Sequence, residues 1–235
     1  MELGATVPHF LKGKTILVTG AAGFLAKVFV EKLLRTQSHI KKLYLLVRAS
    51  DADVAKKRLH DEILRKDLFK VLREKWGKDF DSFISKKVTA LAGDVSAVNL
   101  GIKDANLQTK LTEEIDVIVN LAATTNFDER AKLYGWPNTY VFTKAMGEML
   151  LSHFKDNIPL IIIRPTMVTS TYKEPFPGWI EGFSFDDTNT ERLRMATKEN
   201  DDVGFYDLEF DPKSIDWTHY MMNVHIPGLI KNAVK

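Results

Sequence analysis

A tyrosine and a lysine four residues apart could carry proton-transfer chemistry. Tyr140 and Lys144 lie in an apolar stretch that follows Pro137, a residue typical of helix starts, and that extends to Phe154. Residues four apart share one face of a helix, so the ammonium would lie beside the phenol. A neighbouring cation stabilises phenolate, lowers the tyrosine pKa and makes Tyr140 a usable general acid or base. Because this spacing arises easily by chance, its interpretation depends on the surrounding site.

A glycine-containing turn near the N-terminus could hold a pyrophosphate. Thr15–Val18 is predicted to be a buried strand, and Leu25–Arg35 has apolar residues at helical spacing. Between them Gly20 and Gly23 begin a Gly-x-x-Gly-x-x-Ala pattern that ends at Ala26. A strand that turns sharply into a helix presents backbone N–H groups that bind phosphate. Gly20 would permit the tight turn, and Gly23 would let the phosphates approach the backbone. Ala26 is small enough for the helix to pack closely against the strand. The alternative is a strand–turn–helix without a ligand.

The end of the next predicted strand, Lys42–Arg48, indicates which nicotinamide cofactor would bind. Sites for NAD place a carboxylate beside the adenosine ribose, whereas sites for NADP use an arginine to meet the 2′-phosphate. Here the strand ends in Arg48, and no carboxylate appears until Asp51. A guanidinium makes paired, charge-assisted bonds to phosphate. We therefore predict NADPH, with a solvated arginine as the alternative.

Further strands indicate a parallel sheet with helices between its strands. Lys87–Ala92 is followed by Asp94, whose carboxylate could accept from the adenine amino group or cap the next turn. Asp116–Ala123 is predicted to be a fourth strand, and Leu160–Ile163 one more. The loop 164–166 would then line the ligand crevice. The predicted fold class is α/β, a Rossmann-like doubly wound parallel sheet.

Composition narrows the function classes. The 235 residues are 45% hydrophobic and 27% charged, as in ordinary globular proteins, and a net charge of +2 gives no argument for nucleic acid. The absence of cysteine excludes disulfides and cysteine-based metal sites. No run approaches the roughly 18 apolar residues that span a bilayer, and the N-terminus has no targeting pattern. Any membrane association is therefore expected to be peripheral. Asp53–Trp76 is predicted to be a long helix, broken near Asp67, whose basic face is either solvated or attracted to anionic lipid or coenzyme A phosphates.

Together these motifs resemble the extended short-chain dehydrogenase/reductases, and more closely the plant-type alcohol-forming fatty acyl-CoA reductases. The stretches that carry the resemblance are Gly-Lys-Thr-Ile-Leu-Val-Thr-Gly-Ala-Ala-Gly-Phe-Leu-Ala-Lys (13–27), Lys-Leu-Tyr-Leu-Leu-Val-Arg (42–48), Asn-Leu-Ala-Ala-Thr-Thr-Asn-Phe-Asp-Glu (120–129), Tyr-Gly-Trp-Pro-Asn-Thr-Tyr-Val-Phe-Thr-Lys (134–144) and Ile-Arg-Pro-Thr (163–166).

The resemblance implies reduction of a long-chain fatty acyl-CoA by NADPH, through an aldehyde, to a primary fatty alcohol for waxes, suberin or pollen-wall polymer. Tyr140 would protonate the oxyanion formed on hydride addition, and Lys144 would tune Tyr140 and hold the nicotinamide ribose. The resemblance also implies the cytosolic face of the endoplasmic reticulum, although some members work in plastids. The implied cofactor-binding residues are Thr19, Gly20, Gly23, Phe24, Arg48, Asp94, Asn120, Lys144, Pro165 and Thr166. A nucleotide-sugar epimerase or dehydratase is a further alternative, but such enzymes generally place an acidic residue where Arg48 stands.

The chain departs from this family pattern in two places. Asn120 and Tyr140 are only 20 positions apart, although a parallel crossover alone needs a dozen residues or more, and Thr124–Thr139 contains no strand-like run. The sheet is therefore predicted to lack the strand that in the family carries the Ser or Thr positioning the substrate carbonyl. Phe183–Lys235 resembles the far end of a helical C-terminal domain.

We therefore expect two regions. Residues 1–182 would form an NADP-binding domain shortened near 130/131, and residues 183–235 a short helical remnant. An exposed strand edge and a misplaced tyrosine helix would impair turnover, so cofactor binding is expected to survive better than reductase activity.

Overall fold

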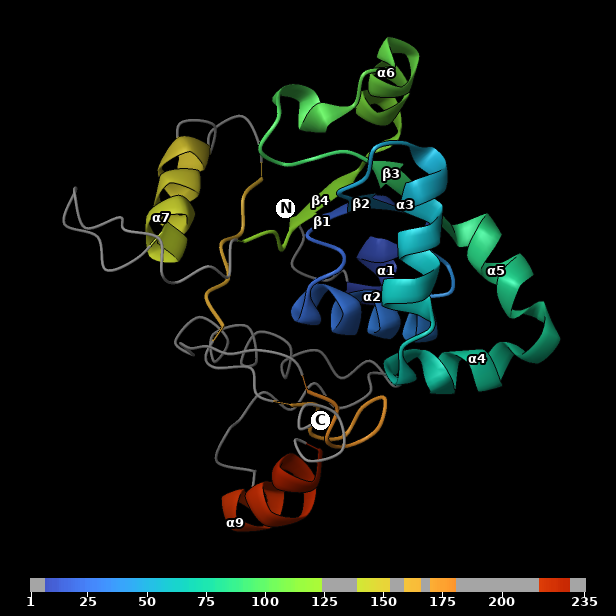
Figure 1. Cartoon of the computed structure of the whole chain (residues 1–235), viewed down its shortest axis with the longest axis vertical. Helices are drawn as coiled ribbons and strands as arrows, with labels where there is room; N and C mark the ends of the chain where they lie inside the picture. The colour runs from blue at the N-terminus through green and yellow to red at the C-terminus, as the bar shows by residue number, and fades with distance from the viewer. Residues whose placement is uncertain (1–6, 124–138, 153–158, 166–169, 181–215, 229–235) are drawn as a thin grey trace. The chain divides into compact units, whose positions relative to one another are not determined.

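Four parallel strands form the centre of the larger part of the molecule. The computed structural model describes residues 7–123, 139–152, 159–165, 170–180 and 216–228 (Figure 1). The strands are β1 (Thr15–Thr19), β2 (Lys42–Val47), β3 (Val88–Ala92) and β4 (Val117–Asn120), in the order β3-β2-β1-β4. This is the order of the first four strands of the doubly wound nucleotide-binding fold, so the predicted α/β class is confirmed.

The central strand β1 is buried along its whole length. Ile16 and Val18 pack into a core cluster with helix α2, whereas Leu17 belongs to a second cluster with Leu111 of helix α6. Figure 1 shows α2 and α6 on opposite sides of the sheet. Because successive side chains of a strand point to opposite faces, the uninterrupted apolar run of β1 reflects a strand covered on both sides.

The helices between β1 and β4 connect the strands of the sheet, and further helices precede and follow them in the chain. Their bounds are α1 (Val7–Leu11), α2 (Phe24–Thr36), α3 (Ala52–Arg58), the π-helix η1 (Leu59–Leu64), the 3₁₀-helix η2 (Asp67–Phe69), α4 (Lys70–Trp76), η3 (Gly77–Asp79), α5 (Phe80–Lys87), η4 (Val98–Gly101), α6 (Ala105–Glu114), α7 (Thr139–Ser152), α9 (Trp217–Tyr220) and the π-helix η7 (Met221–His225). Within the described residues, no helix has both the length and the apolar character needed to cross a membrane.

The predicted helix Asp53–Trp76 is divided into α3, η1, η2 and α4, and the expected break near Asp67 is confirmed. Lys66 has an extended backbone that ends the first helical run, and the turn places Leu68 and Phe69 fully inside the core. Many of the segment's basic side chains have acidic or carbonyl partners. Arg58 binds Glu62, and Arg65 binds Asp61.

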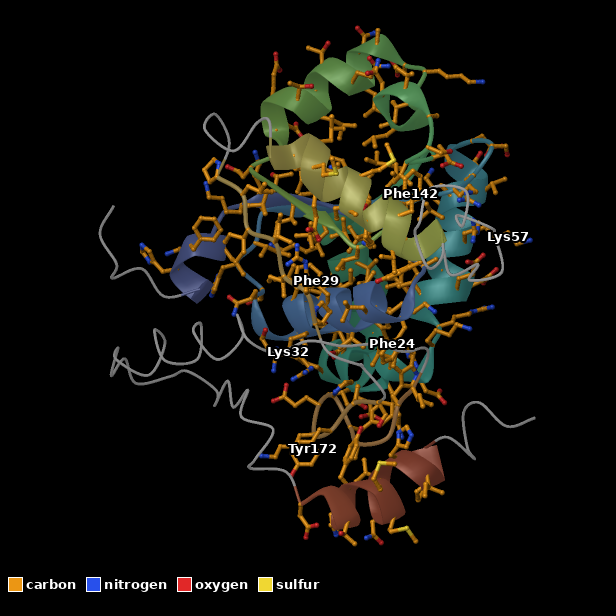
Figure 2. The ribbon with its side chains drawn as sticks, turned by 90° about the vertical axis from the view of Figure 1, so that its left-hand side faces the viewer. Phe24, Phe29, Lys32, Lys57, Phe142 and Tyr172 are labelled. Carbon is orange, nitrogen blue, oxygen red and sulfur yellow. The ribbon has the colours of Figure 1, made fainter. Side chains whose placement is uncertain are left out.

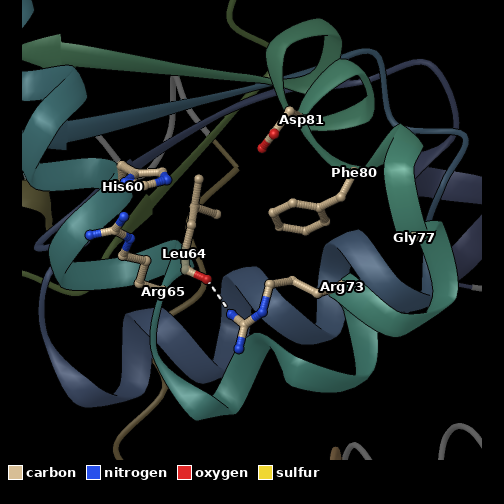
Figure 3. Close-up of a pocket in the computed structure, with 7 residues that line it drawn as sticks. All are labelled: His60, Leu64, Arg65, Arg73, Gly77, Phe80 and Asp81. Carbon is tan, nitrogen blue, oxygen red and sulfur yellow. Dashed lines mark hydrogen bonds between the residues drawn. The ribbon is translucent and has the colours of Figure 1, made fainter.

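A small pocket lies between η1, α4 and α5, lined by His60, Leu64, Arg65, Arg73, Gly77, Phe80 and Asp81 (Figure 3). The guanidinium of Arg73 donates to the carbonyl oxygens of Leu64 and Lys66, at 2.5 and 3.0 Å. Arg73 therefore connects the two helical runs across the break, and its guanidinium is used within the chain.

The strand predicted at Leu160–Ile163 is wrong. Residues 159–165 form neither helix nor strand, and the side chains of Ile161 and Ile163 are 85% and 65% exposed. A strand persists only beside a neighbour that accepts its backbone hydrogen bonds, and an apolar run cannot show whether that neighbour exists.

The chain forms two compact units. One contains Met1–Leu121 and Pro165–Lys235, and the other contains Ala122–Arg164.

Candidate nucleotide-binding site

The turn between β1 and α2 has the conformation that its glycines predict. Gly20 has φ of +66°, in the left-handed region that glycine adopts without strain. The N–H of Gly23 donates to the Gly20 carbonyl at 2.9 Å, and a Cβ on Gly23 would lie 3.2 Å from that oxygen. Ala26 is buried against the core. The predicted close packing is therefore confirmed, while the predicted contact of Gly23 with phosphate stays a prediction.

Helix α2 begins at this turn without a side-chain cap. Gly23 is its N-cap residue and is extended, and among the described residues no side chain hydrogen-bonds to the helix start. The first N–H groups of a helix lack intrahelical partners and carry partial positive charge, so they favour an anion. The residues at this turn therefore fit the pyrophosphate of a dinucleotide.

Thr19 and Asn120 lie side by side at the carboxyl ends of β1 and β4. The Thr19 hydroxyl donates to the Asn120 side-chain oxygen at 2.5 Å. This bond fixes both side chains at the edge of the sheet where ligands of this architecture bind. The structure therefore brings two predicted cofactor residues together. Their contact with a cofactor stays a prediction.

Arg48 and Asp94 form an ion pair that the sequence did not predict. The Arg48 Nε lies 3.0 Å from Asp94 Oδ2, and the Arg48 side chain is 78% exposed. The other carboxylate oxygen of Asp94 accepts from the Ser96 N–H and hydroxyl, at 2.9 and 2.7 Å. These Ser96 bonds, and then the charge of Arg48, lower the pKa of the Asp94 carboxyl. Asp94 therefore caps the turn after β3, one of its two predicted roles.

A further residue at this edge, Gly93, was missed by the sequence analysis. A Cβ there would lie 2.3 Å from the Leu100 carbonyl oxygen and 2.8 Å from Leu46 Cδ1. Glycine is therefore required where β3 ends, because the backbone of the following turn passes directly over it. A glycine immediately before the candidate aspartate was the available signal.

The Tyr140–Lys144 pair lies in the second unit, on α7, one helical turn apart. Lys144 is half-buried, and its ammonium donates to the Ala122 carbonyl at 2.9 Å. Burial lowers the pKa of Lys144, opposed by the charge of Glu148. Glu148 itself accepts from the Arg164 guanidinium, with Nε at 3.1 Å. The predicted helix is confirmed, and Tyr140 is half-buried on it.

Three further residues were predicted to bind the cofactor: Phe24, Pro165 and Thr166. The Phe24 ring stacks on Trp179, with centroids 5.0 Å apart and planes at 22°. Pro165 is exposed. Thr166 lies outside the residues that the structure describes. The structure thus gives Phe24 an aromatic partner, and it gives Pro165 no contact that bears on cofactor binding.

The parallel sheet and the glycine turn between β1 and α2 define a Rossmann-like dinucleotide-binding domain. The chain matches the sequence profile of the NAD-binding family described as "Male sterility protein" over residues 18–134 and 128–190, and it belongs to that family. A nicotinamide dinucleotide is the ligand class of this family.

Curated plant proteins are similar to the chain. It is 42% identical to "Fatty acyl-CoA reductase 8" of Arabidopsis thaliana, over 74% of this chain and 55% of the relative. It is 38% identical to "Alcohol-forming fatty acyl-CoA reductase" of Simmondsia chinensis, over 77% of this chain and 57% of the relative. The chain spans about half the length of the curated relatives it matches.

The alignment with the Arabidopsis reductase has more positions than the number of residues of this chain that it covers. It extends over 274 positions but takes in only 74% of the 235 residues. The Arabidopsis protein therefore has many internal residues without a counterpart here. Among solved structures, a reductase domain of a non-ribosomal peptide synthetase from Mycobacterium tuberculosis is 32% identical, over 53% of this chain and 27% of that one, with a TM-score of 0.41.

Proposed function

We propose that this chain binds NADPH and serves the reduction of a long-chain fatty acyl-CoA to a primary fatty alcohol through an aldehyde. The observation that carries the proposal is the start of α2, which follows the turn at Gly20 and has no side-chain cap. Arg48 comes directly after β2, the strand next to β1 in the sheet. The similarity to plant fatty acyl-CoA reductases supports the substrate class. The expected roles in waxes, suberin or pollen-wall polymer and the location at the endoplasmic reticulum belong to the same proposal.

Cofactor selection would depend on Arg48. The 2′-phosphate of NADPH would compete with the Asp94 carboxylate for the guanidinium, which has room to turn because its side chain is mostly exposed. Asp94 keeps its two Ser96 bonds on the other oxygen, so it stays anchored when Arg48 moves. A phosphate with two negative charges attracts the guanidinium more strongly than one carboxylate does.

The reaction would use the second unit. When bound, NADPH supplies the hydride. Tyr140 would give its phenolic proton to the oxyanion that forms on the substrate carbonyl, and Lys144 would keep a positive charge beside it. The half-buried position of Lys144 and its bond to the Ala122 carbonyl restrict the ammonium to one side of α7. No residue here is assigned the role of the Ser or Thr that positions the substrate carbonyl.

A second candidate function is NADP binding without turnover. The exposed, unpaired conformation at Leu160–Ile163 favours it, as does the 65% exposed Ile118 on β4, at the edge of the described sheet. The internal residues that the Arabidopsis relative has and this chain lacks also support it. The division into an NADP-binding region 1–182, shortened near 130/131, and a helical remnant 183–235 remains part of this proposal.

A cofactor titration and a turnover assay distinguish these candidates. The purified chain is titrated with NADPH and with NADH, and palmitoyl- or stearoyl-CoA reduction is followed in parallel with Tyr140→Phe as the control. We expect NADPH to bind more tightly than NADH, and NADPH binding without turnover would favour the second candidate. Robust turnover that Tyr140→Phe abolishes would refute the idea that the shortened chain is disabled. A preference for NADH would instead favour the nucleotide-sugar epimerase or dehydratase alternative.

A further inference from the structure

A segment far along the chain lies against the helix of the glycine turn. Residues 170–180, here called the strap, contact α2 at both of its ends. The Trp179 ring stacks on Phe24, the first residue of α2. The Glu174 carboxylate binds Lys32 and Arg35 near the last turn, with Arg35 Nη2 at 2.8 Å. Figure 2 shows Phe24 and Lys32 on α2 and Tyr172 on the strap.

The tryptophan is held in place by the strap's own hydrogen bonds. Trp179 is 4% exposed, and its backbone N–H donates to the Thr171 hydroxyl oxygen at 2.9 Å. That hydroxyl donates to the Phe176 carbonyl at 2.7 Å, and the Thr171 N–H donates to the Trp179 carbonyl at 2.8 Å. These bonds fix the backbone at Trp179, each being costly to leave unmade when buried, and the nearly complete burial of the side chain keeps the indole against Phe24.

Near the other end of α2, the strap is held by charge. Arg35 binds Glu174 and also Glu31, whose side chain is fully buried, with Arg35 Nε 2.7 Å from Glu31 Oε1. Hydrogen bonds and charge from Lys32 and Arg35 lower the pKa of Glu174. A partly buried, bridged cluster holds its geometry better than an isolated surface pair. The strap is thus fixed relative to the body of α2, which gives Trp179 a rigid base.

We propose that Trp179 is a positioning residue for the cofactor site. It holds Phe24, and through Phe24 the first turn of α2, whose N–H groups would receive the pyrophosphate. This proposal rests on the proposed NADPH site. The helix start has no side-chain cap, and its first residue, Phe24, is held by packing against the core and by the aromatic stack on Trp179. Donors fixed before the ligand arrives bind more tightly, because less ordering remains to be done on binding.

The test compares two stacked tryptophans of the same unit. Trp179→Ala removes the aromatic stack on Phe24, and Trp179→Phe keeps a smaller ring there. Trp76→Ala is the matched control, because Trp76 stacks on Phe83 at 4.0 Å between α4 and α5. Two ligands are titrated: NADPH, and 2′-AMP, which offers the 2′-phosphate to Arg48 but has no pyrophosphate. Amide hydrogen exchange of residues 20–26 is measured without ligand.

We expect Trp179→Ala to raise the Kd for NADPH by about 10-fold, the scale of one aromatic stack, and Trp179→Phe by less. The Kd for 2′-AMP should change less than about two-fold, since its site is at Arg48. Exchange at 20–26 should accelerate in Trp179→Ala and not in Trp76→Ala. Both tryptophan-to-alanine variants should melt at lower temperature than the wild type.

Three outcomes would overturn the proposal: equal loss of NADPH affinity in Trp76→Ala, equal loss of 2′-AMP affinity in Trp179→Ala, or unchanged exchange at the turn. If Trp179→Ala fails to fold, the Trp179→Phe comparison decides on the same measurements. If the wild type binds neither ligand, the proposed function fails, while the exchange experiment still tests the positioning role of Trp179.

Discussion

At the scale of single residues, the proposed preference for NADPH would depend on a competition between two anions for Arg48. In the structure the guanidinium binds Asp94, and both side chains lie where β2 and β3 end on the same edge of the sheet. The arginine is therefore already held near the place where an adenosine 2′-phosphate would lie. An acidic residue at this position would repel that phosphate.

Arg48→Glu should therefore weaken NADPH binding by about 10-fold or more while changing NADH binding much less. Arg65→Glu is the matched control, because Arg65 is similarly exposed and also binds an aspartate, Asp61. Isothermal titration with both cofactors measures the effect. Equal losses for NADPH and NADH, or an equal loss in Arg65→Glu, would contradict the assigned role of Arg48.

The glycine turn allows a second comparison between matched residues. Gly20→Ala places a side chain at φ of +66°, which should cost about 1–2 kcal/mol of stability. Gly13→Ala is the control, since Gly13 has φ of +72° and open space around it. We expect both variants to lose similar stability in chemical denaturation, and only Gly20→Ala to lose NADPH affinity. A loss of affinity in Gly13→Ala would mean that the effect is general destabilisation.

At the scale of elements, the sequence predicted what depends on local pattern and missed what depends on distant neighbours. The β-branched run 15–18, the glycine turn and the helix around Tyr140 are local signals, and the structure confirms these elements. Leu160–Ile163 has the composition of a strand but not its conformation, because a strand also requires a partner. The Arg48–Asp94 and Phe24–Trp179 contacts join residues far apart in the chain, so no spacing rule could show them.

The junction of β1 with β4 gives a pH-dependent prediction. The Asp116 carboxylate accepts from the Thr15 N–H at 2.8 Å and from Lys14 Nζ at 3.0 Å. These two bonds hold the pKa of Asp116 below its ordinary value of 3.8. A depressed carboxyl pKa adds stability above the unfolded-state pKa, and that stability is lost as the pH falls through the folded-state pKa.

We therefore expect Asp116→Asn to be less stable than the wild type at pH 7, and the difference to shrink as the pH falls below about 4. Urea denaturation between pH 7 and pH 3 measures it. Asp53→Asn, which removes a carboxylate with a 94% exposed side chain from α3, is the control and should show no comparable difference. A constant difference across this range would rule out titration of Asp116 as the cause.

At the scale of the whole molecule, the described C-terminal segment supports the strap. The unit that contains the sheet includes Pro165–Lys235 as well as Met1–Leu121. The buried Tyr220 ring packs edge-on against Tyr172 at 5.7 Å, and its hydroxyl lies 2.6 Å from the Ser170 hydroxyl. Contacts therefore connect residues 216–228 to the strap, and the strap to the start of α2.

This arrangement predicts an effect on cofactor binding from a position remote in sequence. Gly228 and Gly178 are in backbone contact, and a Cβ on Gly228 would lie 1.9 Å from the Gly178 carbonyl oxygen. Gly228→Ala must therefore push the C-terminal segment away from the strap, next to Trp179. We expect a red shift of tryptophan emission, faster amide exchange at residues 20–26 and weaker NADPH binding, in the same direction as for Trp179→Ala.

Gly147→Ala is the control for this variant, because Gly147 lies inside α7 with open space around it, where alanine should stabilise the helix by about 0.5–1 kcal/mol. It should leave the exchange at residues 20–26 unchanged. If Gly228→Ala shifts the emission but leaves both exchange and NADPH affinity at the wild-type level, the C-terminal segment covers the strap without positioning the turn. The coupling would then end at the strap, and the Phe24–Trp179 contact would position the turn without help from the C-terminal segment.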